Sequence, residues 1–301
     1  MVNKPIFFSC QIGSPGVYSK FCNVDNSYDK LDVYVGSIIR YIKNNKQLIG
    51  ISIYGSSLNN PKVLELLQIC KGRNLQVAVD LNCNDCDVEF FYKNISYINV
   101  VRILLYSLDH TKHNNMFDGN NHKNLLKFVD GLTNKKIGKV VVIPVTNDNY
   151  DELIQISDWA HNKKFKINPL PVPKCCGSKV NVLGKENFKT FLKCLQVLQK
   201  DLGDELYLDT PVGYEYFNKP CVCPSFRLSF DVCGNLGIRS CKFSENFLGK
   251  IEDVNMDWAV YKNLWRKSNQ CLKCSDFDKC GGGCICNKYS IGERDFYCSK
   301  K

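Results

Sequence analysis

The sequence lacks several features that would place it in a common class of protein. No apolar run approaches the roughly 20 residues that a membrane-spanning helix needs. The 40 basic and 30 acidic residues give a net charge of +10, but the basic residues are dispersed and no nucleic-acid-binding motif accompanies them. We therefore expect no membrane and no nucleic acid as partners. We interpret the charge as a solvated surface, with an acidic protein partner as the alternative.

Histidine is also scarce, and no familiar catalytic arrangement is present. The four histidines are His110, His113, His122 and His161. The first two follow Asp109 in a polar stretch that we interpret as a solvated loop. No apolar signal segment follows the initial Met-Val-Asn-Lys-Pro, which predicts a cytoplasmic protein in a reducing compartment.

Cysteine, in contrast, is abundant, with 18 residues in 301. Four of them fall within 14 residues in the spacing C-x2-C-x5-C-x3-C, at Cys271, Cys274, Cys280 and Cys284. Three glycines, 281–283, precede the fourth cysteine. Glycine permits positive φ and has no Cβ, so the backbone can wrap closely around a bulky inorganic group. This run is typical of a metal-binding segment.

Three interpretations of the cysteines compete. Disulfides need an oxidising compartment, which the missing signal segment disfavours. Structural zinc usually takes two C-x2-C pairs, and only Cys83/Cys86 and Cys271/Cys274 have that form. Iron–sulfur clusters take thiolates in fours, and a dense run with further distant cysteines is typical of proteins with two clusters. The sequence therefore favours iron–sulfur clusters, with zinc as the alternative.

The first two-thirds of the chain alternates strand-like and helix-like segments. The expected strands are 5–9, 48–54, 75–80, 100–106, 139–144 and 165–167. The expected helices are 31–43, 61–70, 88–93, 121–132, 149–162 and 185–202. Gly72 is expected to end the second helix, and 170–183 to form a loop. Alternating βα units with nearly continuous apolar strands indicate an α/β fold, a parallel sheet with helices packed outside it.

Residues 221–298 resemble the SPASM domain, the C-terminal module of many radical S-adenosylmethionine (radical SAM) enzymes. The family pattern is C-x9–15-G-x4-C, a gap, C-x2-C-x5-C-x3-C, a gap and a last cysteine. Its second half matches this sequence, with Cys298 as the last cysteine. The first half is met by Cys221 or Cys223, then Gly234 and Cys241, with six residues rather than four between the last two. Residues 247–251 also resemble the segment that links the two halves.

The resemblance implies a fold and a set of ligands. It implies a partial (β/α)6 TIM-like barrel over 1–183, a connecting helix and linker over 184–214, and a SPASM-like iron–sulfur domain over 215–301. It implies that one [4Fe–4S] cluster is held by Cys271, Cys274, Cys280 and Cys298. A second would be held by Cys284, Cys241, Cys223 and Cys221, with Cys233 as the alternative to Cys221.

Two more segments resemble conserved landmarks of the radical SAM barrel. The two family motifs that bind the cleaving cluster and S-adenosylmethionine, in contrast, are not intact in this sequence. Residues 106–109 resemble the S-L-D segment of the fourth strand, and 145–153 resemble the T-x-x-N-x-x-E-L stretch after the fifth. The family's C-x3-C-x2-C aligns with Tyr18, Cys22 and Asp25, which leaves one thiolate. The G-G-E-P segment aligns with 54–57, where only Gly55 is kept. S-adenosylmethionine is therefore a doubtful cofactor for this chain.

Other cysteines offer an alternative set of ligands for the cleaving cluster. Cys10, Cys22 and one of Cys83 or Cys86 follow strands whose carboxyl ends meet at the barrel mouth. The competing interpretation is that they are buried or loop thiols that behave as small apolar residues.

The leading hypothesis is an iron–sulfur protein with two auxiliary [4Fe–4S] clusters that serves as a non-cleaving electron-transfer or docking partner. The resemblance implies a peptide or protein partner, because SPASM proteins typically modify peptides or mature another enzyme. One alternative is an active radical SAM peptide-modifying enzyme with atypical ligands for its first cluster. Another is a zinc-stabilised binding module. The sequence leaves open whether the chain is an enzyme.

Overall fold

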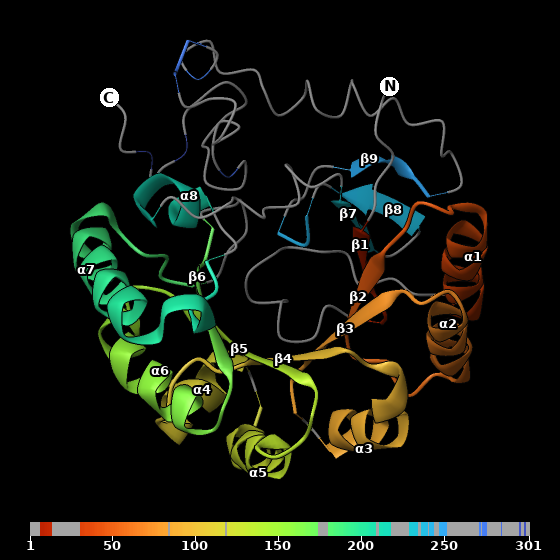
Figure 1. Cartoon of the computed structure of the whole chain (residues 1–301), viewed down its shortest axis with the longest axis horizontal. Helices are drawn as coiled ribbons and strands as arrows, with labels where there is room; N and C mark the ends of the chain where they lie inside the picture. The colour runs from red at the N-terminus through yellow and green to blue at the C-terminus, as the bar shows by residue number, and fades with distance from the viewer. Residues whose placement is uncertain are drawn as a thin grey trace.

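A computed structural model of the chain describes most of the first 208 residues and shorter stretches beyond them (Figure 1). The described residues are 7–13, 31–83, 85–117, 119–173, 180–208, 211–217, 229–233, 236–239, 241–243, 247–251, 271, 273–275, 284, 295 and 298. Among the helices of these stretches, none is both long enough and apolar enough to cross a membrane.

Six parallel strands alternate with helices along the first two-thirds of the chain. The strands are β1 (Phe7–Gln11), β2 (Gly50–Tyr54), β3 (Gln76–Leu81), β4 (Val100–Leu104), β5 (Gly138–Val145) and β6 (Lys166–Pro171). The helices between them are α1 (Leu31–Asn44), α2 (Pro61–Gly72), α3 (Asp85–Asn94), α4 (His110–Phe117), α5 (His122–Leu132) and α6 (Leu153–Asn162). Each strand pairs in parallel with the next, and the helices lie outside the curved sheet (Figure 1). The predicted partial (β/α)6 barrel is confirmed.

The sheet continues into the C-terminal part of the chain. β7 (Ser229–Cys233) pairs in parallel with β1, and β8 (Gly237–Arg239) and β9 (Phe247–Lys250) add antiparallel strands. The strand order is β6-β5-β4-β3-β2-β1-β7-β8-β9. Strands on both sides of the predicted boundary at residue 215 therefore share one sheet. The division into domains remains a prediction, but strands β7 to β9 of its second part extend the barrel sheet.

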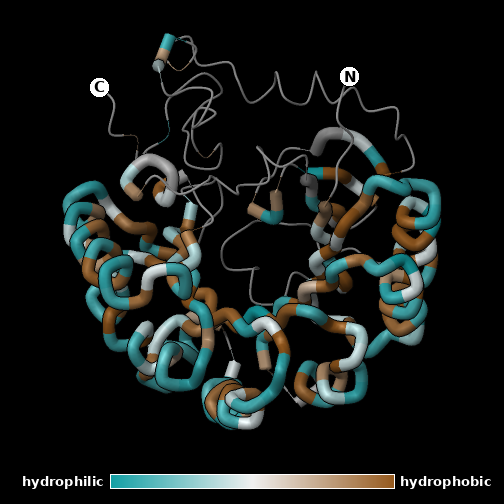
Figure 2. Tube along the Cα trace, in the orientation of Figure 1, coloured by the Kyte–Doolittle hydropathy of each residue, from teal (hydrophilic) through white to brown (hydrophobic). Residues whose placement is uncertain are grey.

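The predicted connecting helix is present as α7 (Lys185–Leu202), followed by α8 (Pro211–Phe217). α7 buries Phe188, Phe191, Leu195 and Leu198, which repeat at the three- and four-residue spacing of one helix face. Figure 2 shows hydrophilic and hydrophobic residues side by side on the outer helices, as expected for helices with one buried face.

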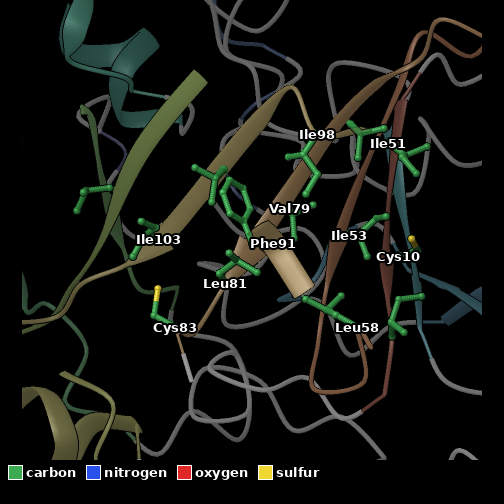
Figure 3. Close-up of a cluster of buried hydrophobic side chains, with 14 of the residues drawn as sticks. Cys10, Ile51, Ile53, Leu58, Val79, Leu81, Cys83, Phe91, Ile98 and Ile103 are labelled. Carbon is green, nitrogen blue, oxygen red and sulfur yellow. The ribbon is translucent and has the colours of Figure 1, made fainter. Parts of the chain in front are cut away.

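The space between the strands and the helices is an apolar core, here called the outer core. Ile53, Val79 and Leu81 enter it from the strands and Phe91 from α3 (Figure 3). Phe91 packs edge to face against Phe128 of α5, with ring centroids 5.1 Å apart. Such geometry contributes about 0.5–1.5 kcal/mol beyond the area that is buried. The outer core fixes the positions of the strands and so of the residues on their inner face.

Two details near element ends follow from the structure. Gly72 ends α2, as predicted, and the positive φ (55°) after the helix lies at Asn74. Asn is the residue after Gly that best tolerates this conformation. The second detail is β6, which runs to Pro171, so the first two residues of the predicted loop 170–183 belong to a strand.

Candidate iron–sulfur site and barrel interior

The inner face of the sheet carries polar side chains where β1, β2 and β7 meet. Because side chains alternate along a strand, Ser9 and Gln11 point inward while Cys10 between them points toward the helices. The Ser9 hydroxyl donates to Asp231 Oδ1 of β7 at 2.5 Å. Gln11 Oε1 accepts a hydrogen bond from Arg239 Nη2 of β8 at 3.3 Å.

A buried ion pair lies at the centre of this polar group. Arg239 Nη2 lies 2.6 Å from Asp231 Oδ2, and both side chains are at most 1% exposed. The Tyr54 hydroxyl donates to the same carboxylate at about 2.9–3.0 Å and accepts from Arg239 Nη2 at 3.1 Å. A buried ion pair is tolerated when its remaining hydrogen-bonding capacity is used in this way. β7 and β8 are thereby bonded to β1 and β2 through side chains, in addition to the backbone pairing of β7 with β1.

A second charged group lies on β3 and β4. Arg102 Nε donates to Asp80 Oδ1 at 2.5 Å and its guanidinium also reaches Ser52 Oγ. Lys242 Nζ lies 3.0 Å from Asp80 Oδ2, and 5.8 Å from the ring centroid of Tyr54. This ion pair and cation–π contact hold the segment next to Cys241 over the ends of β2 and β3.

Aromatic and aliphatic side chains fill another part of the inner face and are here called the interior cluster. Its members are Tyr54, Leu104, Tyr106, Phe117, Val140, Val142, Val172 and Phe243. On β5 its members alternate with Val141 and Ile143, which belong to the outer core. Cys241 and Cys284 both pack against the interior cluster.

Five of the eight predicted cluster ligands lie among the described residues. Cys271 is buried, and Cys241, Cys274, Cys284 and Cys298 are partly buried. The Cys274 N–H donates to the Cys271 carbonyl at 3.0 Å, which is the tight turn expected of a C-x2-C pair. Cys221, Cys223 and Cys280 lie outside the described residues, as does the side chain of Cys233.

The predicted ligands suit an iron–sulfur cluster in their chemistry. All eight are thiols, the ligands by which such clusters are held. Cys241 and Cys284, which are expected to share one group, both contact the interior cluster. The described part of the chain contains no group of three or more His, Cys, Asp or Glu side chains placed to hold a single metal ion.

The two barrel landmarks connect the ends of β4 and β5 by hydrogen bonds. Thr146 Oγ1 lies 2.7 Å from the Tyr106 hydroxyl, and Asn149 Nδ2 donates to the Tyr106 carbonyl at 2.7 Å. The Ser107 hydroxyl donates to Glu152 at 2.5 Å. These polar residues therefore fix the loops that follow the two strands.

The motif positions at the barrel mouth are partly described. Tyr18, Cys22 and Asp25 lie outside the described residues. Gly55 has φ +126°, and a Cβ there would lie 2.1 Å from the Ile12 carbonyl oxygen, so the close contact between β1 and β2 requires glycine. Tyr54, beside it, is 1% exposed and bonded to the Asp231–Arg239 pair.

Cys10 and Cys83 belong to the outer core rather than to the interior (Figure 3). Burial raises the pKa of the Cys10 thiol, and the nearby Asp231 adds to the effect. Burial and then Asp87 likewise raise the pKa of Cys83. Both thiols are therefore held in the neutral form and behave as small apolar residues, which was the alternative to their being cluster ligands. Cys22 and the side chain of Cys86 lie outside the described residues.

The sequence interpretation of His113 as a solvated loop residue was wrong. His113 lies in α4 and is fully buried, with its ring centroid 4.9 Å from Phe117 and 5.0 Å from His122. Burial lowers the pKa of His113 to about 3, and the neighbouring His122 adds to the effect. The apolar Met116 and Phe117, three and four residues further on, were the signal for a helix face that includes His113.

Known proteins match the fold of this chain but not its sequence. A scan of protein-family models finds no match, and a search of curated proteins finds none either. The crystal structure of Streptococcus suis SuiB matches 99% of this chain and 78% of its own, with 16% identity and a TM-score of 0.72. SuiB bound to its precursor peptide SuiA matches 97% and 75%, with 15% identity and a TM-score of 0.71. The structure of anSMEcpe with bound AdoMet matches 98% and 90%, with 16% identity and a TM-score of 0.64.

At these identities the likeness establishes the fold alone. The chain has the fold of SuiB and anSMEcpe, and its six βα units form the expected partial barrel.

Proposed function

We propose that this chain is an iron–sulfur protein of the radical SAM/SPASM type, with two auxiliary [4Fe–4S] clusters. It acts as a non-cleaving electron-transfer or docking partner in the modification of a peptide or protein. One cluster is held by Cys271, Cys274, Cys280 and Cys298. The other is held by Cys241, Cys284, Cys223 and Cys221, and Cys233 is the alternative to Cys221.

The observation that carries the proposal is the contact of Cys241 and Cys284 with the interior cluster. The two cysteines are distant in sequence and come from different halves of the resembled pattern. Lys242, bonded to Asp80, fixes the backbone beside Cys241. A cluster on these thiols would lie against the aromatic side chains of the barrel interior, within reach of a molecule bound at the barrel mouth.

The absence of a cleaving site is supported by changes in two motifs. Tyr18 and Asp25 offer oxygen atoms where thiolates are expected, and iron–sulfur clusters are held overwhelmingly by thiolates. Tyr54 replaces a glycine, and its hydroxyl is bonded to a buried carboxylate. Both changes affect the same expected cofactor, which supports the loss of one activity.

A peptide or protein partner is supported by the fold and by charge. SuiB, which has the same fold, was solved with a precursor peptide. The net charge of +10 would favour association with an acidic segment.

The proposal is tested by measuring whether the protein forms 5′-deoxyadenosine from S-adenosylmethionine. Protein that has been reconstituted with iron and sulfide and then reduced should not cleave S-adenosylmethionine. The Cys22→Ala variant should keep the iron content of the wild type, as should the control variant Cys194→Ala, whose thiol lies on α7. If 5′-deoxyadenosine forms and is lost only in Cys22→Ala, the chain is an active radical SAM enzyme instead.

A further inference from the structure

Asp295 is bonded to two of the predicted cluster ligands. Its carboxylate Oδ2 accepts the Cys284 N–H at 2.5 Å, and its backbone carbonyl accepts the Cys298 N–H at 3.0 Å. The residue is 8% exposed. Cys284 and Cys298 belong to different clusters in the proposed assignment, so Asp295 lies between the two ligand sets.

The hydrogen bond from the Cys284 N–H to Asp295 fixes the backbone of Cys284. Three consecutive glycines precede Cys284, and glycine loses more conformational entropy on ordering than any other residue. A charge-assisted hydrogen bond is roughly twice as strong as a neutral one. The Asp295 carboxylate can therefore hold the Cys284 backbone in place where the local sequence does not.

The same bond has an electrostatic consequence. Iron–sulfur potentials depend on the net charge around the cluster and on hydrogen bonds to its sulfur atoms. A carboxylate beside Cys284 adds negative charge, which opposes the uptake of an electron. It also takes up the Cys284 N–H, which is then not available to a cluster sulfur. Both effects lower the reduction potential.

We propose that Asp295 is a positioning residue that fixes Cys284 and Cys298 and lowers the reduction potential of the cluster that Cys284 holds. The inference rests on the proposed function, because it takes both cysteines as cluster ligands. It adds a residue that the resembled cysteine pattern does not contain, and it predicts that the two clusters differ in potential.

The experiment is an anaerobic redox titration of the reconstituted full-length protein, followed by EPR. Asp295→Asn keeps an oxygen that can accept the Cys284 N–H but removes the charge. At a fixed potential, the ratio of reduced to oxidised cluster should rise about tenfold for one of the two signals, which is about 59 mV for a one-electron couple. The iron content should stay that of the wild type. Asp158→Asn, which removes an exposed carboxylate on α6, should leave both signals unchanged.

A second variant tests the positioning role. Asp295→Ala removes the side-chain acceptor and should lose the signal of the cluster that Cys284→Ala also loses, with the other signal kept. Unchanged midpoint potentials in Asp295→Asn, or both signals retained in Asp295→Ala, would overturn the inference while the clusters remain. Wild-type protein without iron and sulfide would instead contradict the proposed function, and the inference with it.

Discussion

On the outer face of the sheet, β1 to β3 present Cys10, Ile53 and Val79 to the helices, whereas on the inner face the same strands present Ser9, Tyr54 and Asp80. The outer residues need only apolar neighbours of suitable volume. Of the inner residues, Tyr54 and Asp80 are buried and Ser9 is partly buried, and each polar atom among them needs a partner, because an unpaired buried polar group costs about 1–3 kcal/mol.

One strand can therefore pack apolar side chains against the helices on one face and position hydrogen-bonded side chains on the other. A shift of one residue along a strand exchanges the faces, so the register that places Ile53 in the outer core also directs Tyr54 to the Asp231–Arg239 pair. It also separates the cysteines into two kinds. Cys10 and Cys83 fill the outer core, whereas Cys241 and Cys284 contact the interior cluster.

The largest expected effect comes from breaking the inner ion pair. Asp231→Ala leaves the fully buried Arg239 without its carboxylate, and removal of one partner of such a pair costs about 3–5 kcal/mol. Urea unfolding should show this loss in the free energy of unfolding. Asp158→Ala, at an exposed position on α6, should change it by about 0.5 kcal/mol or less. Equal stability of the two variants would mean that the ion pair does not hold β7 and β8 to the barrel.

A somewhat smaller effect is expected from His113. Its pKa of about 3 in the folded protein is below the value of about 6.5 in the unfolded chain, so the unfolded state binds more protons between these values. Stability should therefore be full above pH 6.5 and fall as the pH falls, by about 3 kcal/mol at pH 4.

His113→Phe removes the titrating group and should make the free energy of unfolding less dependent on pH between 4 and 6.5. Val33→Phe, at an exposed position on α1 that carries no titrating group, is the control, and its pH dependence should follow that of the wild type. The same pH dependence in all three proteins would show that His113 is not held neutral by burial.

The smallest effect is expected at Cys10 and separates the two kinds of cysteine. Cys10→Ser places a hydroxyl in the outer core and should cost about 1–3 kcal/mol, whereas Cys10→Ala should cost less. Neither variant should change the amount of iron bound per chain. A loss of iron in Cys10→Ala would make Cys10 a candidate cluster ligand again. The outer face of the sheet would then also carry a ligand, which contradicts the assignment of Cys10 as a core residue.

Much of the barrel could be predicted because its signals are local. The segment 139–144 is apolar after Lys139, as strands buried on both faces are, and α7 was predicted with its observed limits. The pairing of β7 with β1 was not predicted. It joins residues more than 200 positions apart, and no local pattern in Ser229–Cys233 indicates a neighbour.

The cysteine pattern predicted ligands, but not the residues that support them. Asp231 and Arg239 are charged, and a sequence suggests a solvated position for such residues unless their partners are known. The role of Asp295 is likewise recognised from its hydrogen bonds to Cys284 and Cys298 in the structure. The spacing of cysteines along the sequence can identify ligands that lie close together in the chain. Buried ion pairs, in contrast, depend on contacts between segments that are distant in sequence.

The proposed function requires that the chain hold two auxiliary clusters and no cleaving cluster. Iron and acid-labile sulfide, quantified per chain after anaerobic reconstitution and accompanied by Mössbauer spectra, test it directly. About eight irons per chain with matching sulfide, all in [4Fe–4S] form, are expected. About twelve irons would contradict it in favour of an active radical SAM enzyme, and zinc without sulfide would contradict it in favour of a zinc-stabilised binding module.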